Sequence, residues 1–539
     1  MTPETRSLTD DQPEVAASAP VPPPPAGPPA MSPVELGRWA WRQLTSMRTA
    51  LILLFLLALA AIPGSVVPQE AVDSLRASRW KADHPSLTPV YERLGLFDVY
   101  GSPWFAAIYL LLVVSLVGCI LPRSAVYWRA FRAQPPRAPR HLGRMPDNRS
   151  YQTGEAPSEV LEKARSLLRE RRYRIRDTED AEPADAVSAE RGYLREAGNL
   201  LFHVSVLVVL AGFAMGALFG FKGGVIVVTG DSFSNTLSQY DDFAPGRAFA
   251  PDDLAPFSFK VDSFDVTFIR KGRSAGSATK FFADLDVQSS PTSAPSRQRI
   301  AVNHPLTIDG TKVFLIGHGY APHITVRDGK GNVAYSGATV FLPENEAFTS
   351  FGVVKAPDAE PKQIGLSGEF YPTYAFTPAT GPFSAFPDAK NPALSMLAYS
   401  GDLGLDTGEA QSVYALDMKG LKPITKADGK PVRLDLPLGK TAALPDGLGT
   451  VTFDGLSRFV RLQVSETPGS KVALAGMVLA LTGLLASLFI RPRRIWLRAR
   501  REGDRTIVEV AGLDRSSGGD LTGELDQILG ALEPKESRA

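Results

Sequence analysis

One histidine, His203, lies inside an otherwise apolar run at residues 199–220. A helix of about 22 residues is roughly 33 Å long, which is enough to cross a hydrocarbon core of about 30 Å. An imidazole in that core needs a partner, because an unpaired polar group in hydrocarbon is unfavourable by several kilocalories. Two interpretations stay open: the ring bonds a neighbouring helix, or it is a ligand for a bound group.

Three of the six histidines, His304, His318 and His323, fall within twenty residues of the chain. A metal site would require them to meet on facing strands with a closed coordination shell. Side chains alternate along a strand, so His318 and His323 would point to opposite faces of a continuous one. We therefore expect turn and surface histidines here, with a metal or haem site as the alternative.

The single cysteine, Cys119, cannot form an internal disulfide, and the sequence has no CxxC motif. A chain with one thiol is not a thiol–disulfide oxidoreductase by itself. The sequence also lacks a catalytic triad pattern, a P-loop and a dinucleotide-binding fingerprint. We therefore expect no catalytic residues. The formal net charge of +1 does not indicate a nucleic-acid partner, and none is expected.

Residues 49–67, 104–121 and 472–490 also have the length and composition of membrane helices, which with 199–220 predicts four spans. A long polar N-terminus precedes the first span, so we expect a retained helix rather than a cleaved signal peptide. Arginines cluster beside one end of each span: Arg42, Arg48, Arg123, Arg129, Arg132, Arg137, Arg140, Arg144, Arg191, Arg195, Arg491, Arg493, Arg494, Arg498, Arg500 and Arg501. The positive-inside rule predicts that both termini are cytoplasmic and that residues 221–471 are extracytoplasmic.

The segments outside the spans predict the domains. Residues 1–40 are rich in proline and are expected to be a disordered cytoplasmic tail. Residues 68–103 form an external loop, residues 122–196 a cytoplasmic linker, and residues 491–539 a cytoplasmic C-terminal tail. Periodicity in the two cytoplasmic pieces predicts helices and strands at 158–170, 173–176, 186–190, 505–511 and 521–532. Neither piece has enough apolar surface alone, so we expect them to join in one small α/β unit.

Residues 221–471 are dense in alternating, β-branched and aromatic stretches separated by turns, such as the one at 328–331. Strands are predicted at 225–229, 258–268, 280–287, 312–316, 323–328, 332–341 and 412–418. Many short antiparallel strands favour a sandwich or an open barrel. The predicted fold is an integral membrane protein with four transmembrane α-helices, a large extracytoplasmic all-β, sandwich-like domain, and a small cytoplasmic α/β unit.

Three stretches point to a known family when taken in their order along the chain: residues 94–104 (LGLFDVYGSPW), 198–203 (GNLLFH) and 302–328 (VNHPLTIDGTKVFLIGHGYAPHITVRD). With the layout of two helices, a connection, a third helix, a β domain and a fourth helix, they resemble the ResB/CcsB family of cytochrome c biogenesis proteins. The resemblance covers approximately residues 40–535 and leaves out the proline-rich head.

The resemblance implies a bacterial plasma-membrane subunit in system II of cytochrome c maturation. Such a subunit acts with a ResC/CcsA-type partner, which carries a tryptophan-rich external haem-binding segment. Together the two deliver haem across the membrane and support its attachment to the CxxCH motifs of apocytochrome c. A thiol-reducing thioredoxin-like protein is a further implied partner. The chain itself would be a non-catalytic subunit of a haem–cytochrome c synthase complex, with haem as a transient cofactor shared with the partner.

The third-helix histidine of that family matches His203, which becomes the candidate axial haem ligand. One histidine supplies one axial ligand, and the sequence has no second histidine in a span and no tryptophan cluster. The partner must therefore supply the other ligand. Arg191 and Arg195 would either pair with haem propionates or only set the topology. The alternative function is a membrane-anchored extracytoplasmic binding or sensory protein without haem.

Overall fold

The computed structural model describes residues 32–70, 72, 74–176, 185–405, 411–514 and 521–533. Among these residues, four helices are long and apolar enough to cross a membrane: α2 (Met47–Val66), α5 (Pro103–Arg132), α7 (Leu194–Phe219) and α8 (Ser470–Phe489). The four predicted spans are therefore confirmed. Helix α5 continues well past residue 121, into the segment that was expected to be linker. A further helix, α1 (Pro33–Leu44), begins inside the segment that was expected to be a tail.

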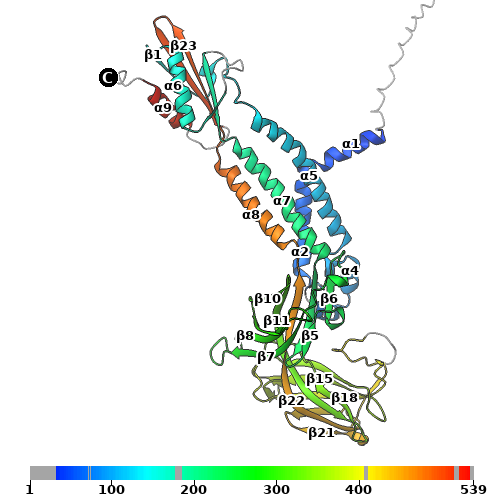
Figure 1. Cartoon of the computed structure of the whole chain (residues 1–539). Coiled ribbons are helices and arrows are strands. Elements are labelled where there is room, and N and C mark those ends of the chain that lie inside the picture. Colours follow the sequence, from blue (N-terminus) through cyan, green and yellow to red (C-terminus); the bar gives the residue numbers. More distant parts are fainter. Residues whose placement is uncertain are drawn as a thin grey trace, which may run out of the picture.

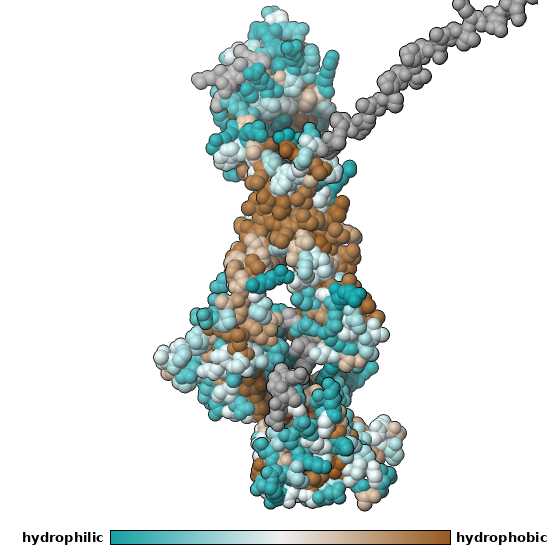
Figure 2. All heavy atoms as spheres, turned by 90° about the vertical axis from the view of Figure 1, so that its right-hand side faces the viewer, coloured by the Kyte–Doolittle hydropathy of each residue, from teal (hydrophilic) through white to brown (hydrophobic). Residues whose placement is uncertain are grey.

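The four spans stand in a row rather than in a closed bundle (Figure 1). Extensive contacts join α2 to α5, α5 to α7 and α7 to α8. Within the most apolar stretch of each span, between 11% and 17% of the residues are buried by the rest of the chain. Most of the row is consequently free to meet lipid or another protein, and Figure 2 shows it as a continuous hydrophobic band.

Helices α7 and α8 pack most closely because glycines line their contact. A Cβ atom added at Gly483 of α8 would lie 2.6 Å from the backbone nitrogen of Phe202, and one added at Gly212 of α7 would lie 2.6 Å from that of Ala473. Such close backbone approach between membrane helices requires small residues. Helix α7 meets α5 differently, since the Tyr109 hydroxyl of α5 donates a hydrogen bond to the Leu210 carbonyl.

The segments before α7 and after α8 share one antiparallel five-stranded sheet. The two segments were predicted to join, because neither has enough apolar surface to form a core alone. Its strands, in order, are β1 (Asp147–Thr153), β24 (Arg505–Asp514), β23 (Arg493–Glu502), β3 (Ala186–Arg191) and β2 (Arg174–Ile175). Helices α6 (Pro157–Glu170) and α9 (Leu521–Leu532) complete this α/β unit, and their apolar faces share its core. Strands β1 and β23 were not predicted from the sequence.

Between α7 and α8 the described chain is almost entirely β. One sheet has the order β10 (Leu306–Ile308), β11 (Thr311–Arg327), β22 (Gly449–Glu466), β4 (Phe221–Val228), β6 (Asp242–Pro245), with β12 (Val333–Ala338) and β21 (Thr441–Leu444) attached. A second has the order β13 (Leu342–Pro343), β14 (Ser350–Ala356), β15 (Ile364–Tyr371), β18 (Ala393–Gly401), β19 (Leu421–Pro423), with β20 (Arg433–Pro437) on β18. The others are β5 (Ser232–Ser234), β7 (Ser258–Phe268), β8 (Ala278–Gln288), β9 (Ser296–Ala301), and the pair β16 (Tyr374–Thr377) and β17 (Gly381–Ser384).

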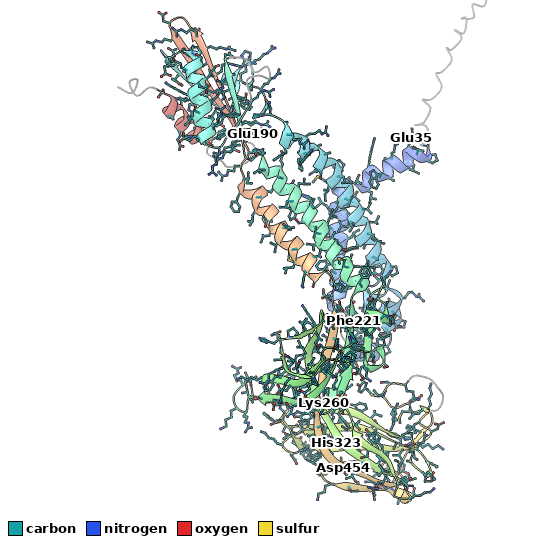
Figure 3. The ribbon with its side chains drawn as sticks, viewed as in Figure 1. Glu35, Glu190, Phe221, Lys260, His323 and Asp454 are labelled. Atoms are coloured by element: carbon teal, nitrogen blue, oxygen red, sulfur yellow. The ribbon has the colours of Figure 1, made fainter. Side chains whose placement is uncertain are left out.

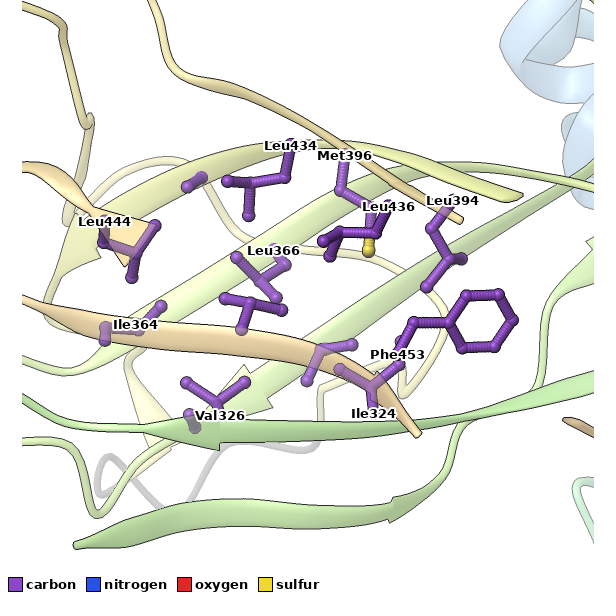
Figure 4. Packing of buried hydrophobic residues seen from close by; sticks show 14 of the residues in the cluster. Ile324, Val326, Ile364, Leu366, Leu394, Met396, Leu434, Leu436, Leu444 and Phe453 are labelled. Atoms are coloured by element: carbon purple, nitrogen blue, oxygen red, sulfur yellow. The ribbon is translucent and has the colours of Figure 1, made fainter. Parts of the chain in front are cut away.

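Two hydrophobic cores hold this β region, and the paired strands β11 and β22 run through both. Val313 and Leu315 near the start of β11 belong to the core nearer the membrane helices, whereas Ile324 and Val326 near its end belong to the distal core. Figure 4 shows the distal core, where Phe453 of β22 packs with these side chains. None of the sheets closes into a barrel within the described residues. The sandwich-like all-β prediction is confirmed.

The structure differs from three of the predicted strands. The segments 312–316 and 323–328 form one long strand, β11, with register shifts rather than a turn between them. Residues 412–418 do not form a strand. Side-chain hydrogen bonds, rather than pairing with a neighbouring strand, hold this segment. Lys355 donates to the Ser412 carbonyl (3.0 Å), and Tyr414 donates to Asp241 (3.1 Å).

The predicted loop between the first two spans contains short helices: α3 (Ser74–Asp83), α4 (Thr88–Arg93) and the 3-10 turn η1 (Leu96–Asp98). It contacts the β region directly. Arg247 donates to the Gly101 carbonyl (2.7 Å), and Arg79 donates to the Pro343 carbonyl (3.2 Å). These bonds connect the β region to the loop between α2 and α5, at the end of the helix row where α7 ends and α8 begins.

Candidate functional site

The candidate ligand His203 lies on α7, nine residues and therefore about 14 Å from the start of the helix. Asn199 precedes it by one turn and Leu210 follows it by two, so the three lie on one side of the helix. That side faces α5, since the Leu210 carbonyl accepts from Tyr109 and the Asn199 amide lies 3.5 Å from the Tyr127 hydroxyl. His203 therefore does not point into the glycine-lined contact with α8.

The hydrogen bonding of the His203 ring determines which nitrogen can bind a ligand. Its Nδ1 lies 2.8 Å from the Asn199 carbonyl oxygen. A carbonyl oxygen only accepts, so Nδ1 carries the proton and Nε2 keeps its lone pair. Within the part of the chain that the structure describes, no group donates to Nε2.

A phenylalanine ring helps to hold this orientation. Phe202 meets the imidazole edge-on, with ring centroids 5.4 Å apart and planes at 90°. Metal-binding histidines commonly donate a hydrogen bond from the ring nitrogen that does not bind the metal, as Nδ1 of His203 does to the Asn199 carbonyl. That bond fixes the tautomer and the direction of the lone pair on the other nitrogen. The His203 ring is also only partly buried. The Nε2 atom of this ring could therefore bind a metal ion.

The described residues do not place His203 in a metal-binding cluster. Among the residues that the structure describes, no three or more His, Cys, Asp or Glu side chains gather as a metal-binding group. The nearby Arg195 donates from Nε to the Ser487 carbonyl of α8 (3.2 Å). Arg191 lies with Glu524 of the α/β unit at 3.9 Å. Both arginines thus contact other elements of the chain.

The three histidines of the β region lie in separate surroundings. His304 is exposed, with Nδ1 3.1 Å from the Val302 carbonyl oxygen, as a turn histidine would be. The Nε2 atom of His323 lies 2.7 Å from the Ser457 hydroxyl. Figure 3 labels His323 in the β region, far beyond Phe221 at the end of the helix row. His304, His318 and His323 therefore do not form a common site.

His318 differs from what was expected, because it is enclosed by aromatic rings rather than lying at the surface. It stacks on Phe348 at 4.7 Å and packs against Phe264 at 4.9 Å. Burial, aided by the charge of Arg458, lowers the pKa of its imidazole to about 4. Its buried Nδ1 has no hydrogen-bond partner among the described residues. The ring is therefore neutral at physiological pH and behaves as part of the packing.

Two tyrosines of α5, Tyr109 and Tyr127, contact α7 on its His203 side, and neither contact was predicted from the sequence. The spacing of Asn199 and His203, one helical turn apart, could have indicated the backbone carbonyl that the ring contacts, but this contact was not predicted. The tyrosines lie about a hundred and about seventy residues from their α7 partners, and no local pattern joins them.

Comparison with known proteins gives a consistent match along the chain. The ResB-like family matches residues 47–526. A protein named Cytochrome c biogenesis protein CcsB from Nostoc sp. is 24% identical over 477 residues, which cover 86% of this chain and 87% of that relative. Its namesake from Synechococcus elongatus is 26% identical over 485 residues, covering 87% and 89%. The namesake from Gloeobacter violaceus is 30% identical over 287 residues, so that match spans 51% of this chain and 55% of the relative.

Proposed function

This chain belongs to the ResB-like family and is a membrane protein of cytochrome c biogenesis, and we propose that it delivers haem together with a ResC/CcsA-type partner. In this proposal His203 provides one axial ligand to haem iron within the membrane and the partner provides the other. The observation that carries the proposal is the Nδ1–Asn199 hydrogen bond, because it leaves Nε2 with a free lone pair on a partly open ring.

The row of helices supports a shared site. Axial ligation by two histidines needs an imidazole on each side of the porphyrin, and this chain has one histidine in its spans. Helix α7 is an inner member of the row, between α5 and α8, and the His203 ring on its α5 side is only partly buried, so it would be reached from a face of the row and not from an edge. A partner that covers this face would bring its own ligand opposite His203 and would bury the apolar surface that the row leaves open.

The proposal also assigns an orientation. The arginine-rich ends of the spans would face the cytoplasm, which places both termini and the α/β unit there and the β region outside. His203 lies about 12 Å along the helix from Arg195, within the cytoplasmic half of the bilayer. Haem that enters from the cytoplasm would therefore reach His203 before it reaches the outer face, where attachment to apocytochrome c takes place. A thioredoxin-like protein would keep the cysteine thiols of apocytochrome c reduced for haem attachment.

The test is the haem content of the complex purified with its partner, measured for the wild type, His203→Ala and His304→Ala. The two variants remove one imidazole each, and His304 is exposed and lies in the β region outside the four spans. We expect His203→Ala to lose most of the haem and to stop cytochrome c maturation in cells, while His304→Ala retains both. Unchanged haem in His203→Ala, with the partner still bound, would favour the alternative of a membrane-anchored binding or sensory protein.

A further inference from the structure

A charged pocket opens in the α/β unit beside the ends of α7 and α8. It has a volume of about 370 Å³ and is lined by Arg171, Arg191, Arg493, Gly523, Glu524 and Gln527. Arg191 comes three residues before α7, and Arg493 comes four residues after α8. Since a residue spans at most about 3.6 Å, both arginines lie within about 14 Å of the membrane helices. Figure 3 labels Glu190, the neighbour of Arg191, at this junction.

The inner wall of the pocket is already paired. The side chain of Arg493 is 16% exposed and forms ion pairs with Asp514 (3.3 Å) and with Glu524. Tyr173 also donates its hydroxyl to Glu524 (2.8 Å). These contacts give the carboxylates of Asp514 and Glu524 partners within the protein. The inner wall of the pocket is therefore a hydrogen-bonded and ion-paired network.

The mouth of the pocket keeps unused donors. The side chain of Arg191 is 53% exposed, and its ion-pair distance to Glu524 is long at 3.9 Å. Arg171 makes a single long hydrogen bond, from Nη2 to the Gln527 carbonyl at 3.5 Å. Each guanidinium has five N–H donors. Most of these ten donors therefore have no acceptor among the described residues.

We propose that this pocket binds the phosphate group of an anionic phospholipid at the membrane surface. Guanidinium groups match phosphate oxygens with paired N–H donors, and basic pockets beside membrane helices bind anionic head groups. The six lining residues include no apolar or aromatic side chain that could pack against a porphyrin, which argues against haem itself. A soluble phosphate shares the recognised chemistry and is the other source to be distinguished.

The experiment uses the full chain in lipid nanodiscs, with phosphatidylglycerol and phosphatidylcholine as probes and native mass spectrometry to count retained lipid. The double variant Arg171→Gln/Arg191→Gln is compared with Arg505→Gln. Arg505 belongs to the β23–β24 turn, where it pairs in register with Glu502, about 30 Å along the sheet from Arg493. We expect the double variant to lose phosphatidylglycerol binding at least tenfold and Arg505→Gln to keep it.

Inorganic phosphate titrated against the protein in detergent separates the two sources. Retention of phosphatidylglycerol that exceeds phosphatidylcholine and depends on the two arginines supports the lipid site. If phosphate binds through these arginines but phosphatidylglycerol does not, the lipid source is overturned. Equal phosphatidylglycerol retention in the double variant and the wild type overturns the site altogether. None of these outcomes depends on haem binding at His203.

A separate feature, helix α1, carries a second and independent inference. Leu36, Ala40 and Leu44 recur at intervals of four residues on one face of the helix. Arg38 and Arg42 lie on the opposite face. No residue of α1 is buried by the chain, and Leu36 is 54% exposed. The helix is nevertheless well defined, since Ser32 forms a capping box at its start.

Contacts with α5 fix where α1 lies along the row. Ser115 donates its hydroxyl to the Leu44 carbonyl (2.6 Å), and the thiol of Cys119 lies 2.7 Å from the Thr45 carbonyl oxygen. Helix α2 begins directly afterwards, at Met47. We infer that α1 lies in the membrane surface at the start of α2, with its apolar face among the acyl chains and its arginines among the head groups.

Single cysteines test this placement in a Cys119→Ser background, with Leu36→Cys on the apolar face and Arg38→Cys on the polar face. A membrane-impermeant maleimide is applied to the protein in nanodiscs and in mild detergent. In nanodiscs we expect position 38 to react at least tenfold faster than position 36. Equal reaction rates at both positions would overturn the inference. Protection of position 36 that requires the bound partner protein would overturn it too.

Discussion

The helix row and the β region bury their residues to very different degrees. Each span leaves most of its apolar stretch open, whereas the β region encloses two continuous cores that β11 and β22 connect. Their histidines differ in the same way. His203 has one nitrogen bonded and the other free, on a ring that is partly open. His318 is enclosed by phenylalanines. The β region is buried around its own cores, whereas the row leaves most of its apolar surface and one imidazole nitrogen open.

The largest effect is expected where the row is most tightly packed. In Gly483→Ala the new Cβ would lie 2.6 Å from the Phe202 nitrogen and 2.7 Å from the Gly198 carbonyl oxygen, so α7 and α8 must separate. We expect a loss of about 3 kcal/mol in stability, measured by denaturation in detergent, together with weaker haem retention. The control is Gly37→Ala, since nothing lies within 4 Å of a Cβ at Gly37. Equal stability of the two variants would show that the row is loosely packed.

The enclosed histidine predicts a pH dependence in the β region. The pKa of His318 is about 4 in the folded protein and about 6.5 when unfolded, so the unfolded chain takes up a proton first as the pH falls. Its contribution to stability is therefore complete above about pH 6.5 and is lost towards pH 4, by up to about 3 kcal/mol. Melting of the β region at pH 7.5 and pH 5 measures this loss.

The matched variants for this measurement are His318→Phe and His304→Gln. His318→Phe removes the titrating group and keeps a ring in the aromatic cluster, so its melting temperature should fall less between the two pH values. His304→Gln alters an exposed ring and should follow the wild type. A slope in His318→Phe as steep as that of the wild type would contradict the enclosed, neutral imidazole.

A smaller effect is expected from one hydrogen bond in the β region. The Tyr320 side chain is 1% exposed, and its hydroxyl donates to the Pro387 carbonyl (2.7 Å). Tyr320→Phe keeps the ring and removes this bond, for an expected loss of about 1 kcal/mol in unfolding free energy. Denaturant titration of the β region measures it. No change in stability would mean that water replaces the hydroxyl.

The same substitution in the row is expected to have the smallest effect. Tyr109→Phe removes the hydrogen bond to the Leu210 carbonyl between α5 and α7. Interhelical hydrogen bonds in membranes contribute about 0.6 kcal/mol on average, which sets the expected loss in detergent denaturation. A loss larger than that of Tyr320→Phe would reverse the comparison, and would indicate that polar contacts rather than glycine packing hold the row together.

The sequence was sufficient where one physical signal dominates. Long apolar runs predicted the four spans, and the single histidine within them pointed to His203. Alternation predicted β7 and the periodicity predicted α9 with the observed bounds. These signals are local, and tertiary packing did not override them.

Strand β23 shows where local signals fail. Its arginines were interpreted only as signals of membrane topology, and the strand was not predicted. In the structure Arg498 is buried and donates to the Pro139 and Arg140 carbonyls inside the α/β unit. The row, the contacts of the α5 tyrosines with α7 and the enclosure of His318 all depend on contacts between distant segments. No spacing in the sequence reports such contacts.

The most direct measurement is the absorption spectrum of the complex with its partner, recorded for the wild type and for His203→Gly with and without added imidazole. If His203 is an axial ligand, the wild type shows haem with two nitrogen ligands, the variant loses that spectrum, and imidazole entering the vacated space restores it. A His203→Gly complex with the wild-type spectrum and no response to imidazole would show that another residue binds the iron.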